Sequence, residues 1–230
     1  MPASRAVGAA EWVLTVAAAA IIAIAAVGLA LFPVTTPAAV ESLVWAVGSN
    51  ETAGVSSQAV YRMAEAVRLF VVDRSAPGLP AAVEGSVGFD EAAVSHLVDV
   101  REVLIPARQL TLALAILAAV WIALGLRRGG RLGVVVGRSL VCAGAALLVT
   151  GALALIAGAL DFDGLFAWFH GLFFADGTWT FPDSALLIRV FPLPFWIAAG
   201  ALWGGLVVAA AAALVLVGRS HYFTECSDGV

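Results

Sequence analysis

The sequence predicts an all-α membrane protein with four transmembrane helices and a mostly helical extracytoplasmic cap. Of its 230 residues, 62% are apolar and only 12% are charged. Soluble domains average about 45–50% apolar and about 25% charged residues. The apolar residues also come in long blocks, which is the pattern of membrane-spanning helices. We therefore expect residues 1–230 to form a single membrane domain.

Four apolar blocks are long enough to cross a bilayer, whose hydrocarbon core needs about 20 consecutive apolar residues per helix. They cover about residues 12–32, 107–126, 132–160 and 191–218, and none contains an acidic residue. The first block is longer than the roughly 7–15 apolar residues of a cleavable signal peptide. It is therefore expected to remain as an uncleaved anchor.

The charges between these blocks predict the orientation, because short cytoplasmic loops collect positive charge. The turn at 127–131 carries three arginines and no acid, whereas segment 161–190 carries four aspartates and one arginine. Segment 33–102 is also acidic, with nine acids against four arginines. We expect both termini and the arginine turn in the cytoplasm, and a cap of residues 33–106 and 161–190 outside. The net charge of −4 gives no support for a nucleic-acid partner.

The first cap segment should contain short helices. Thr36 followed by Pro37 has the residue types of a helix N-cap and first helical position. Residues 58–71 place apolar side chains at helical spacing. Asp90 should cap a further helix that ends at Leu104, after which a proline permits a bend into the second span.

This last cap helix carries the first candidate functional residues. His96 and Asp99 are three residues apart and therefore share a face of the helix, whereas Arg101 points elsewhere. Taken alone, His96 is better interpreted as a solvated or capping histidine. A partner from elsewhere in the chain is needed to make it a catalytic candidate.

The second cap segment is rich in aromatic residues. Eleven lie between positions 162 and 196, and eight of these are phenylalanines. A belt at the membrane interface explains tryptophan, whose ring has a polar edge, better than it explains phenylalanine. Two alternatives therefore stay open: an interfacial belt, or a pocket for an acyl or lipid group with Trp168, Phe173 and Trp179 in its wall.

His170 lies within this aromatic stretch. The expected topology puts His170 at the same membrane face as His96, and puts the third histidine, His221, on the opposite side. A neutral imidazole accepts a proton near pH 7, as a general base must. The two histidines of the cap are therefore candidates for one shared site.

Two motifs around these histidines resemble the signatures of the bacterial lipoprotein intramolecular transacylase (Lit) family. The first runs from Phe89 to Arg101, reads FDEAAVSHLVDVR and resembles the F…HM-x-DV-K signature. The second begins at Trp168 and reads WFHGLFFADGTWTF. The resemblance extends over nearly the whole chain. It departs from the family pattern at Leu97, where Met is frequent, and at Arg101, where Lys is common.

The resemblance implies an acyltransferase of the bacterial cytoplasmic membrane, with its active site at the extracytoplasmic face. His96 and His170 match the two signature histidines and would be catalytic. The substrate would be a diacylglyceryl-lipoprotein, whose sn-2 acyl chain moves to the α-amino group of the N-terminal cysteine. Membrane lipids are the other expected partners, and no cofactor or metal is implied. The residues expected to bind the substrate are Asp99, Arg101, Trp168, Phe173 and Trp179.

Two further functions remain as alternatives. A metal-assisted lipid hydrolase would use nitrogen and oxygen ligands from His96, Asp99, His170 and Asp176, although no compact metal-binding motif supports it. A membrane scaffold or sensor would carry the aromatic residues as a belt and the histidines as ordinary surface residues. A transporter is disfavoured because the four apolar blocks contain no acidic residue.

Overall fold

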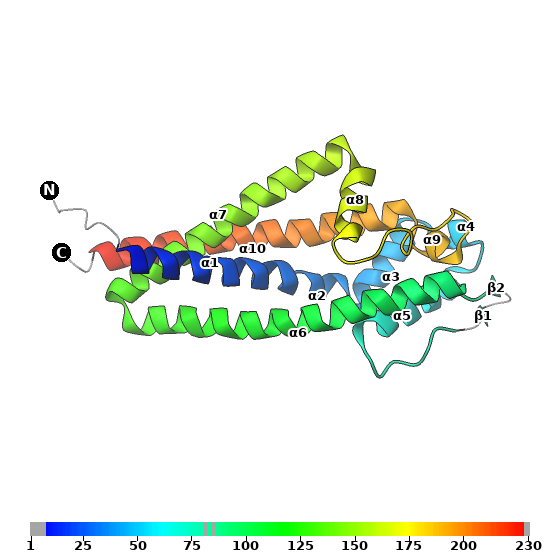
Figure 1. The fold of residues 1–230 in the computed structure, drawn as a ribbon, viewed down its shortest axis with the longest axis horizontal. Coiled ribbons are helices and arrows are strands. Elements are labelled where there is room, and N and C mark those ends of the chain that lie inside the picture. Colours follow the sequence, from blue (N-terminus) through cyan, green and yellow to red (C-terminus); the bar gives the residue numbers. More distant parts are fainter. Residues whose placement is uncertain (1–7, 81, 84–85, 228–230) are drawn as a thin grey trace. The chain divides into compact units, whose positions relative to one another are not determined.

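The computed structural model describes residues 8–80, 82–83 and 86–227 (Figure 1). It divides into two compact units, which we describe separately. Unit 1 comprises Met1–Ala30, Leu110–Leu155 and Gly205–Val230, and unit 2 comprises Leu31–Gln109 and Ile156–Gly204. The expected cytoplasmic position of the chain ends concerns residues 1–7 and 228–230, which lie outside the described residues.

The chain is built almost entirely from helices, which confirms the predicted fold class. The helices are α1 (Ala9–Leu29), α2 (Leu31–Val34), α3 (Pro37–Ala46), α4 (Ser49–Ala53), α5 (Ser57–Val72), α6 (Glu91–Arg128), α7 (Gly130–Leu160), α8 (Phe162–Gly171), α9 (Leu186–Val190) and α10 (Leu193–Ser227). A small antiparallel hairpin of β1 (Ala82–Val83) and β2 (Ser86–Val87) interrupts this order. The hairpin was not expected from the sequence.

Four helical stretches are long and apolar enough to cross a membrane. They are Ala9–Val34, Glu91–Arg128, Gly130–Leu160 and Leu193–His221. Each overlaps one of the four predicted blocks, so the prediction of four spans is confirmed.

The second span and the cap helix before it form one continuous helix, α6. We expected this cap helix to end at Leu104, and that expectation is wrong, because α6 runs for 38 residues with Pro106 inside it. A proline removes only one backbone donor from a helix. In membrane helices, neighbouring groups and small local adjustments compensate for this loss.

The helices of unit 1 approach one another closely at glycines. A Cβ atom added to Gly144 of α7 would lie 2.5 Å from the carbonyl oxygen of Ala211 in α10. The neighbouring core contains buried Ile22 of α1, Ala118 of α6 and Leu140 of α7. Small residues are typical of packed membrane helices, because they let two backbones come close.

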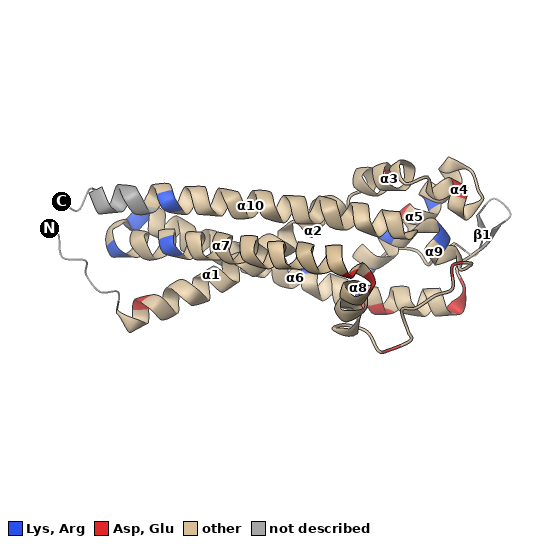
Figure 2. Ribbon diagram, turned by 90° about the horizontal axis from the view of Figure 1, so that it is seen from above, with Lys and Arg blue, Asp and Glu red and all other residues tan. Residues whose placement is uncertain are grey.

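The positive charges of unit 1 gather where its helices begin or end. Figure 2 shows them at the end of α6, near the start of α7 and towards the end of α10. Arg131, at the start of α7, lies 4.0 Å from the carboxylate of Glu11 in the first turn of α1. The arginine turn between α6 and α7 therefore lies at the same end of this unit as the start of α1.

Unit 2 has its own apolar core, formed by α3, α5, the start of α6, α9 and the start of α10. Met63 of α5, Val44 of α3 and Val190 of α9 are among its fully buried side chains. Residues 58–71 were expected to be helical and lie within α5. Thr36 accepts a hydrogen bond from the backbone N–H of Ala39, which confirms the predicted N-cap of α3.

Arg189 ties α9 to α4 in unit 2. Its guanidinium donates to the carbonyl oxygens of Thr52 and Ala53, and the Thr52 hydroxyl donates back to the Arg189 carbonyl at 2.7 Å. These bonds join segments far apart in the sequence. They anchor one end of the loop between α8 and α9, which carries several of the aromatic residues.

Candidate functional site

His96 is held in the second turn of α6 by the packing and capping of that helix. The Asp90 side chain accepts a hydrogen bond of 2.8 Å from the backbone N–H of Ala93, so Asp90 caps the helix as predicted. Ala93 and Leu97 are buried in the core of unit 2, and His96 itself is only 8% exposed. The backbone of α6 therefore fixes His96 in an apolar setting.

His170 lies near the end of α8, one turn after Phe166. Helix α8 begins at Phe162, and its N-cap residue Asp161 accepts a 2.8 Å hydrogen bond from the backbone N–H of Gly164. The Nδ1 atom of His170 lies 2.8 Å from the carbonyl oxygen of Phe166. A carbonyl oxygen only accepts hydrogen bonds, so Nδ1 must carry a proton. In the neutral ring, Nε2 then has the free lone pair.

Burial also favours the neutral form of this ring. It lowers the pKa of His170 below its ordinary value, and the hydrogen bond to the Phe166 carbonyl offsets part of this effect. His170 is therefore a neutral imidazole near pH 7, with a basic nitrogen available at Nε2.

The fold of unit 2 brings the two histidines together. The ring centroids of His96 and His170 are 6.4 Å apart, and the planes of the rings are inclined by 32°. A small group placed between the two rings is within hydrogen-bonding reach of both, directly or through one water molecule. The structure therefore places a histidine pair where one reacting centre can use both rings.

Aromatic rings surround this pair. The Phe174 and Phe181 centroids lie 5.0 Å and 5.6 Å from the His96 ring. The Phe166 and Trp179 centroids lie 3.9 Å and 4.9 Å from the His170 ring. We call these four residues the aromatic enclosure. These rings are partly buried, and their apolar faces suit an acyl chain better than a polar ligand.

The three aromatic residues expected in a pocket wall separate in the structure. Trp179 belongs to the aromatic enclosure, and its buried indole nitrogen has no hydrogen-bond partner among the described residues. Trp168 is 63% exposed, and Phe173 is 48% exposed. The aromatic stretch thus contains partly buried rings beside the histidines as well as exposed rings, and both the pocket and the belt stay predictions.

Asp99 and Arg101 make no hydrogen bond to either histidine among the described residues. Burial lowers the pKa of His96, and the negative charge of Asp99, which is exposed three residues later on α6, offsets part of this effect. The guanidinium of Arg101 lies over the ring of Phe70 in α5, 4.2 Å from its centroid. Arg101 therefore packs between two helices.

Sequence reasoning did not single out Phe166, Phe174 and Phe181 as residues of the site. A signal for two of them was present: Phe166, His170 and Phe174 follow one another at intervals of four residues. On a helix this spacing places side chains on one face. Phe181 carried no such signal, because it reaches His96 only through the course of the loop after α8.

The four residues proposed for a metal-assisted hydrolase are not brought together. Among the residues that the structure describes, no group of three or more His, Cys, Asp or Glu side chains is placed to hold one metal ion. Asp176 and Asp99 are both exposed. The geometry thus assembles the two histidines of that ligand set and leaves its two carboxylates apart.

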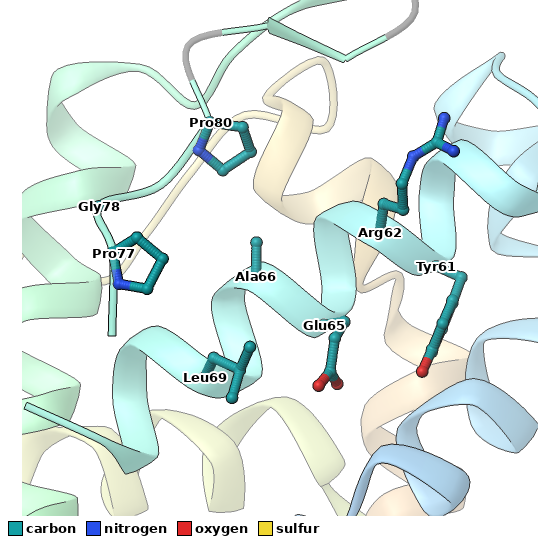
Figure 3. Close-up of a pocket in the computed structure, with 8 residues that line it drawn as sticks. All are labelled: Tyr61, Arg62, Glu65, Ala66, Leu69, Pro77, Gly78 and Pro80. Atoms are coloured by element: carbon teal, nitrogen blue, oxygen red, sulfur yellow. The ribbon is translucent and has the colours of Figure 1, made fainter. Parts of the chain in front are cut away.

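A shallow cavity of about 420 Å³ lies elsewhere in unit 2 (Figure 3). Its lining comes from one face of α5 and from residues 77–80, and it contains no histidine. Tyr61 and Glu65 project from α5 at its edge, opposite Pro77. The cavity is therefore separate from the histidine pair.

Comparison with known protein families gives one match over most of the chain. The model of the family described as "Lipoprotein intramolecular transacylase Lit" matches residues 12–196. These residues include both histidines and the whole aromatic enclosure. A search of the curated proteins finds no match.

Solved structures show the same fold. The membrane integral lipoprotein intramolecular transacylase Lit from Bacillus cereus matches with a TM-score of 0.77 and 14% sequence identity, over 95% of this chain and 98% of that chain. A second structure of that protein, with one histidine replaced by arginine, has a TM-score of 0.70 at 14% identity and covers 95% of each chain. A third, with a histidine replaced by alanine, gives the same TM-score and identity over 95% of this chain and 96% of that chain.

Proposed function

Because this chain belongs to the lipoprotein intramolecular transacylase (Lit) family of acyltransferases, we propose that it moves an acyl chain within a lipoprotein. The acyl chain leaves the sn-2 oxygen of the diacylglyceryl group and joins the α-amino group of the N-terminal cysteine. The observation that carries the proposal is the 6.4 Å separation of the His96 and His170 rings inside an aromatic enclosure. The active site is the histidine pair of unit 2.

His170 takes the role of the general base. Its Nε2 lone pair is free because Nδ1–H donates to the Phe166 carbonyl. An α-amino group has a pKa of about 7.7–8.0, so an imidazole can accept a proton from it near neutral pH. The amine nitrogen attacks the ester carbonyl carbon as it loses that proton.

His96 acts on the other side of the reacting ester. An N–H of its ring donates a hydrogen bond to the carbonyl oxygen, which gains negative charge as the amine adds. The carbon–oxygen bond to the glyceryl group then breaks, an amide bond remains, and His170 returns its proton to the glyceryl oxygen. No atom is gained or lost, so the reaction is an isomerisation.

The aromatic enclosure meets the remaining requirement, which is to position the amine and the ester for reaction. The amine and the ester are joined by a flexible chain through the cysteine and the glyceryl group, so few free conformations bring them together. Rings that hold the acyl chain beside the histidines select a conformation ready for attack. Such positioning can contribute several kcal/mol to the rate.

The proposal places the active site at the extracytoplasmic membrane face, where mature lipoproteins carry their lipid. Two observations support this orientation. The arginines of unit 1 gather at the turn between α6 and α7, and cytoplasmic turns collect positive charge. The cap segments of unit 2 are acidic.

The test is the structure of the lipoprotein product. The chain is expressed in a bacterial host that lacks lipoprotein N-acylation, so that α-amino groups start free. An isomerisation leaves the lipoprotein mass unchanged, while tandem mass spectrometry finds one acyl group on the cysteine nitrogen and one on the glyceryl group. Loss of one acyl mass would identify a hydrolase, and fragments identical to those of the empty host would favour a scaffold.

A further inference from the structure

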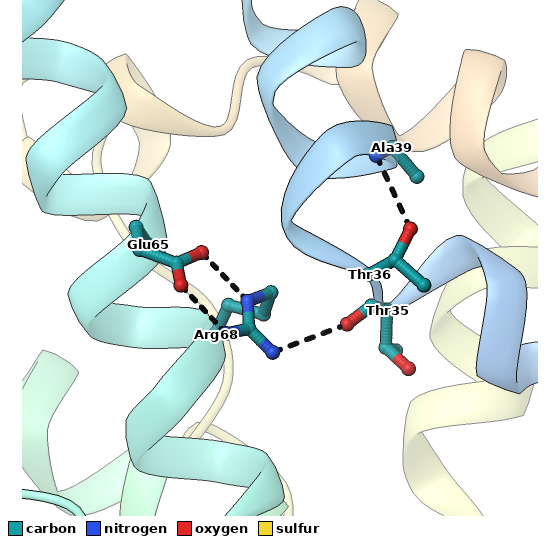
Figure 4. Close-up of polar contacts among 5 residues, drawn as sticks. All are labelled: Thr35, Thr36, Ala39, Glu65 and Arg68. Carbon is teal, nitrogen blue, oxygen red and sulfur yellow. Dashed lines mark hydrogen bonds and ion pairs between the residues drawn. The ribbon is translucent and has the colours of Figure 1, made fainter.

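Two arginines from different helices of unit 2 converge on Thr35, which lies between α2 and α3. The Arg108 Nη1 atom of α6 donates a 2.8 Å hydrogen bond to the Thr35 hydroxyl. The Arg68 Nη1 atom of α5 donates to the Thr35 carbonyl oxygen at 3.3 Å (Figure 4). We call Thr35, Arg68 and Arg108 the arginine cluster.

The cluster carries more positive than negative charge. Glu65 accepts two hydrogen bonds of 2.6 Å from Arg68, so this pair is neutral. The side chains of Arg68 and Glu65 are only 12% and 23% exposed, so neither is freely solvated. Arg108 contacts no carboxylate among the described residues, and its guanidinium lies 4.1 Å from the centroid of the Phe32 ring. Arg68, Glu65 and Arg108 together therefore carry one net positive charge.

The cluster lies at one edge of two apolar stretches of the sequence. Thr35 directly follows the apolar stretch Ala9–Val34. Arg108 lies in Glu91–Arg128, at the beginning of the apolar block 107–126. Their hydrogen bond places both at one boundary between an apolar region and the cap. Lipid headgroups occupy this depth in a bilayer, and basic residues there attract anionic headgroups.

We propose that the arginine cluster binds the phosphodiester of an anionic phospholipid headgroup. Arginine presents five N–H donors in a planar fork that matches phosphate oxygens, and Arg108 uses one of them on Thr35. A headgroup with a net charge of −1 neutralises the remaining positive charge of the cluster. A zwitterionic headgroup brings its own cation and leaves that charge in place.

The full-length protein in lipid nanodiscs tests this site. Wild-type protein is compared in phosphatidylcholine discs with and without phosphatidylglycerol, and its unfolding temperature is measured. We expect phosphatidylglycerol to raise the unfolding temperature by about 3 °C or more, because a ligand that binds only the folded state stabilises it. The Arg108→Gln variant should show no such rise.

Arg74→Gln is the matched control. It removes the same charge from the turn just after α5, but Arg74 is 56% exposed and pairs with Glu102 outside the cluster. This variant should keep the rise seen in the wild type. An equal rise in the Arg108→Gln and Arg74→Gln variants would overturn the proposal, because lipid charge would then act without the cluster.

A second measurement tests the proposal even if the Arg108→Gln variant does not fold. Native mass spectrometry of wild-type protein released from mixed discs should show retained phosphatidylglycerol in preference to phosphatidylcholine, and equal retention would overturn the proposal.

Inorganic phosphate is the last probe. A rise with phosphate alone, in phosphatidylcholine discs, would assign the cluster to a free phosphate ion, whereas no rise with phosphate supports the lipid headgroup.

Discussion

His170 shows how a local backbone contact fixes the chemistry of a side chain. Its Nδ1–H bond to the Phe166 carbonyl selects one tautomer, and burial keeps the ring neutral. The hydrogen bond lies within a single turn of α8, whereas the rings packed around His170 also come from α6 and from the loop after α8. The tautomer of His170 thus depends on a local contact, and its charge state depends on the packing of unit 2.

We predict that His170 titrates below the ordinary histidine pKa of about 6.5. Burial lowers the pKa of His170, so the neutral base persists as the pH falls through 6.5 and is lost only under more acidic conditions. Imidazole ¹⁵N spectra should show this midpoint, with the neutral form protonated at Nδ1. The chain contains only three histidines, so His96→Gln and His221→Gln variants assign the signal. A midpoint at or above the ordinary value would contradict the prediction.

We predict that Trp179 and Trp168 differ sharply in their effect on activity. Replacing Trp179 by Ala removes a ring 4.9 Å from His170 and should lower the acyl-transfer rate by roughly 10-fold or more. Trp168→Ala changes a residue that is 63% exposed and serves as the control, with a rate close to wild type.

A Trp179→Phe variant separates the ring from its indole N–H. Phenylalanine keeps most of the apolar surface but removes the buried nitrogen that has no partner among the described residues. A rate near that of wild type would assign the effect to packing, and a rate near that of the Ala variant would assign it to the N–H. Equal rates in Trp179→Ala and Trp168→Ala would contradict the proposed enclosure.

The helices were largely predictable, because capping residues and apolar periodicity are local properties. Thr36 and Asp90 have the residue types of N-caps, and both accept the expected backbone hydrogen bonds. The continuity of α6 through Pro106 was not predictable from local preference. Whether a helix continues through a proline depends on the packing and solvent around it, and a short stretch of sequence does not contain this information.

We predict that the close approach of α7 and α10 depends on Gly144. A Cβ atom there meets the Ala211 carbonyl at 2.5 Å and a Val215 side-chain carbon at 2.7 Å. Gly144→Ala should therefore lower the free energy of unfolding by roughly 1–3 kcal/mol, since overpacking forces the helices apart. Denaturant titration in detergent measures the change.

Gly151→Ala is the matched control in the same helix. A Cβ at Gly151 meets nothing within 4 Å, and alanine favours helix over glycine by about 1 kcal/mol. This variant should be as stable as the wild type or slightly more stable. Equal stability of the two variants would show that α7 and α10 do not require the glycine contact.

The expected orientation in the membrane rests on charge distributed over the whole chain. It comes from counting arginines and acids, which requires no three-dimensional information, and it stays a prediction. The pairing of His96 with His170 could not be predicted in this way. It depends on how α6 and α8 pack within unit 2, and the sequence indicated only that both residues belong to the cap. The single membrane domain over residues 1–230 likewise stays a prediction.

We predict that the turn between α6 and α7 is cytoplasmic. Gly129 and Gly130 adopt positive φ angles of 57° and 55°, so a cysteine probe is better placed at Arg128. In a background without the two native cysteines, an impermeant thiol reagent added to intact cells should leave Arg128→Cys unlabelled. Ser184→Cys, in the exposed loop before α9, should be labelled. The reverse pattern would move the histidine pair to the cytoplasmic side.

The joint action of the two histidines on one lipoprotein is tested most directly with a synthetic diacylglyceryl lipopeptide. Its sn-2 acyl chain carries an isotope label, and it is mixed with an unlabelled lipopeptide of different peptide mass. Purified wild-type protein should place the label on the amino group of the same peptide only. His96→Ala and His170→Ala should each abolish transfer, and His221→Ala should retain it. Undiminished transfer in both cap-histidine variants, or label distributed over both peptides, would contradict the mechanism.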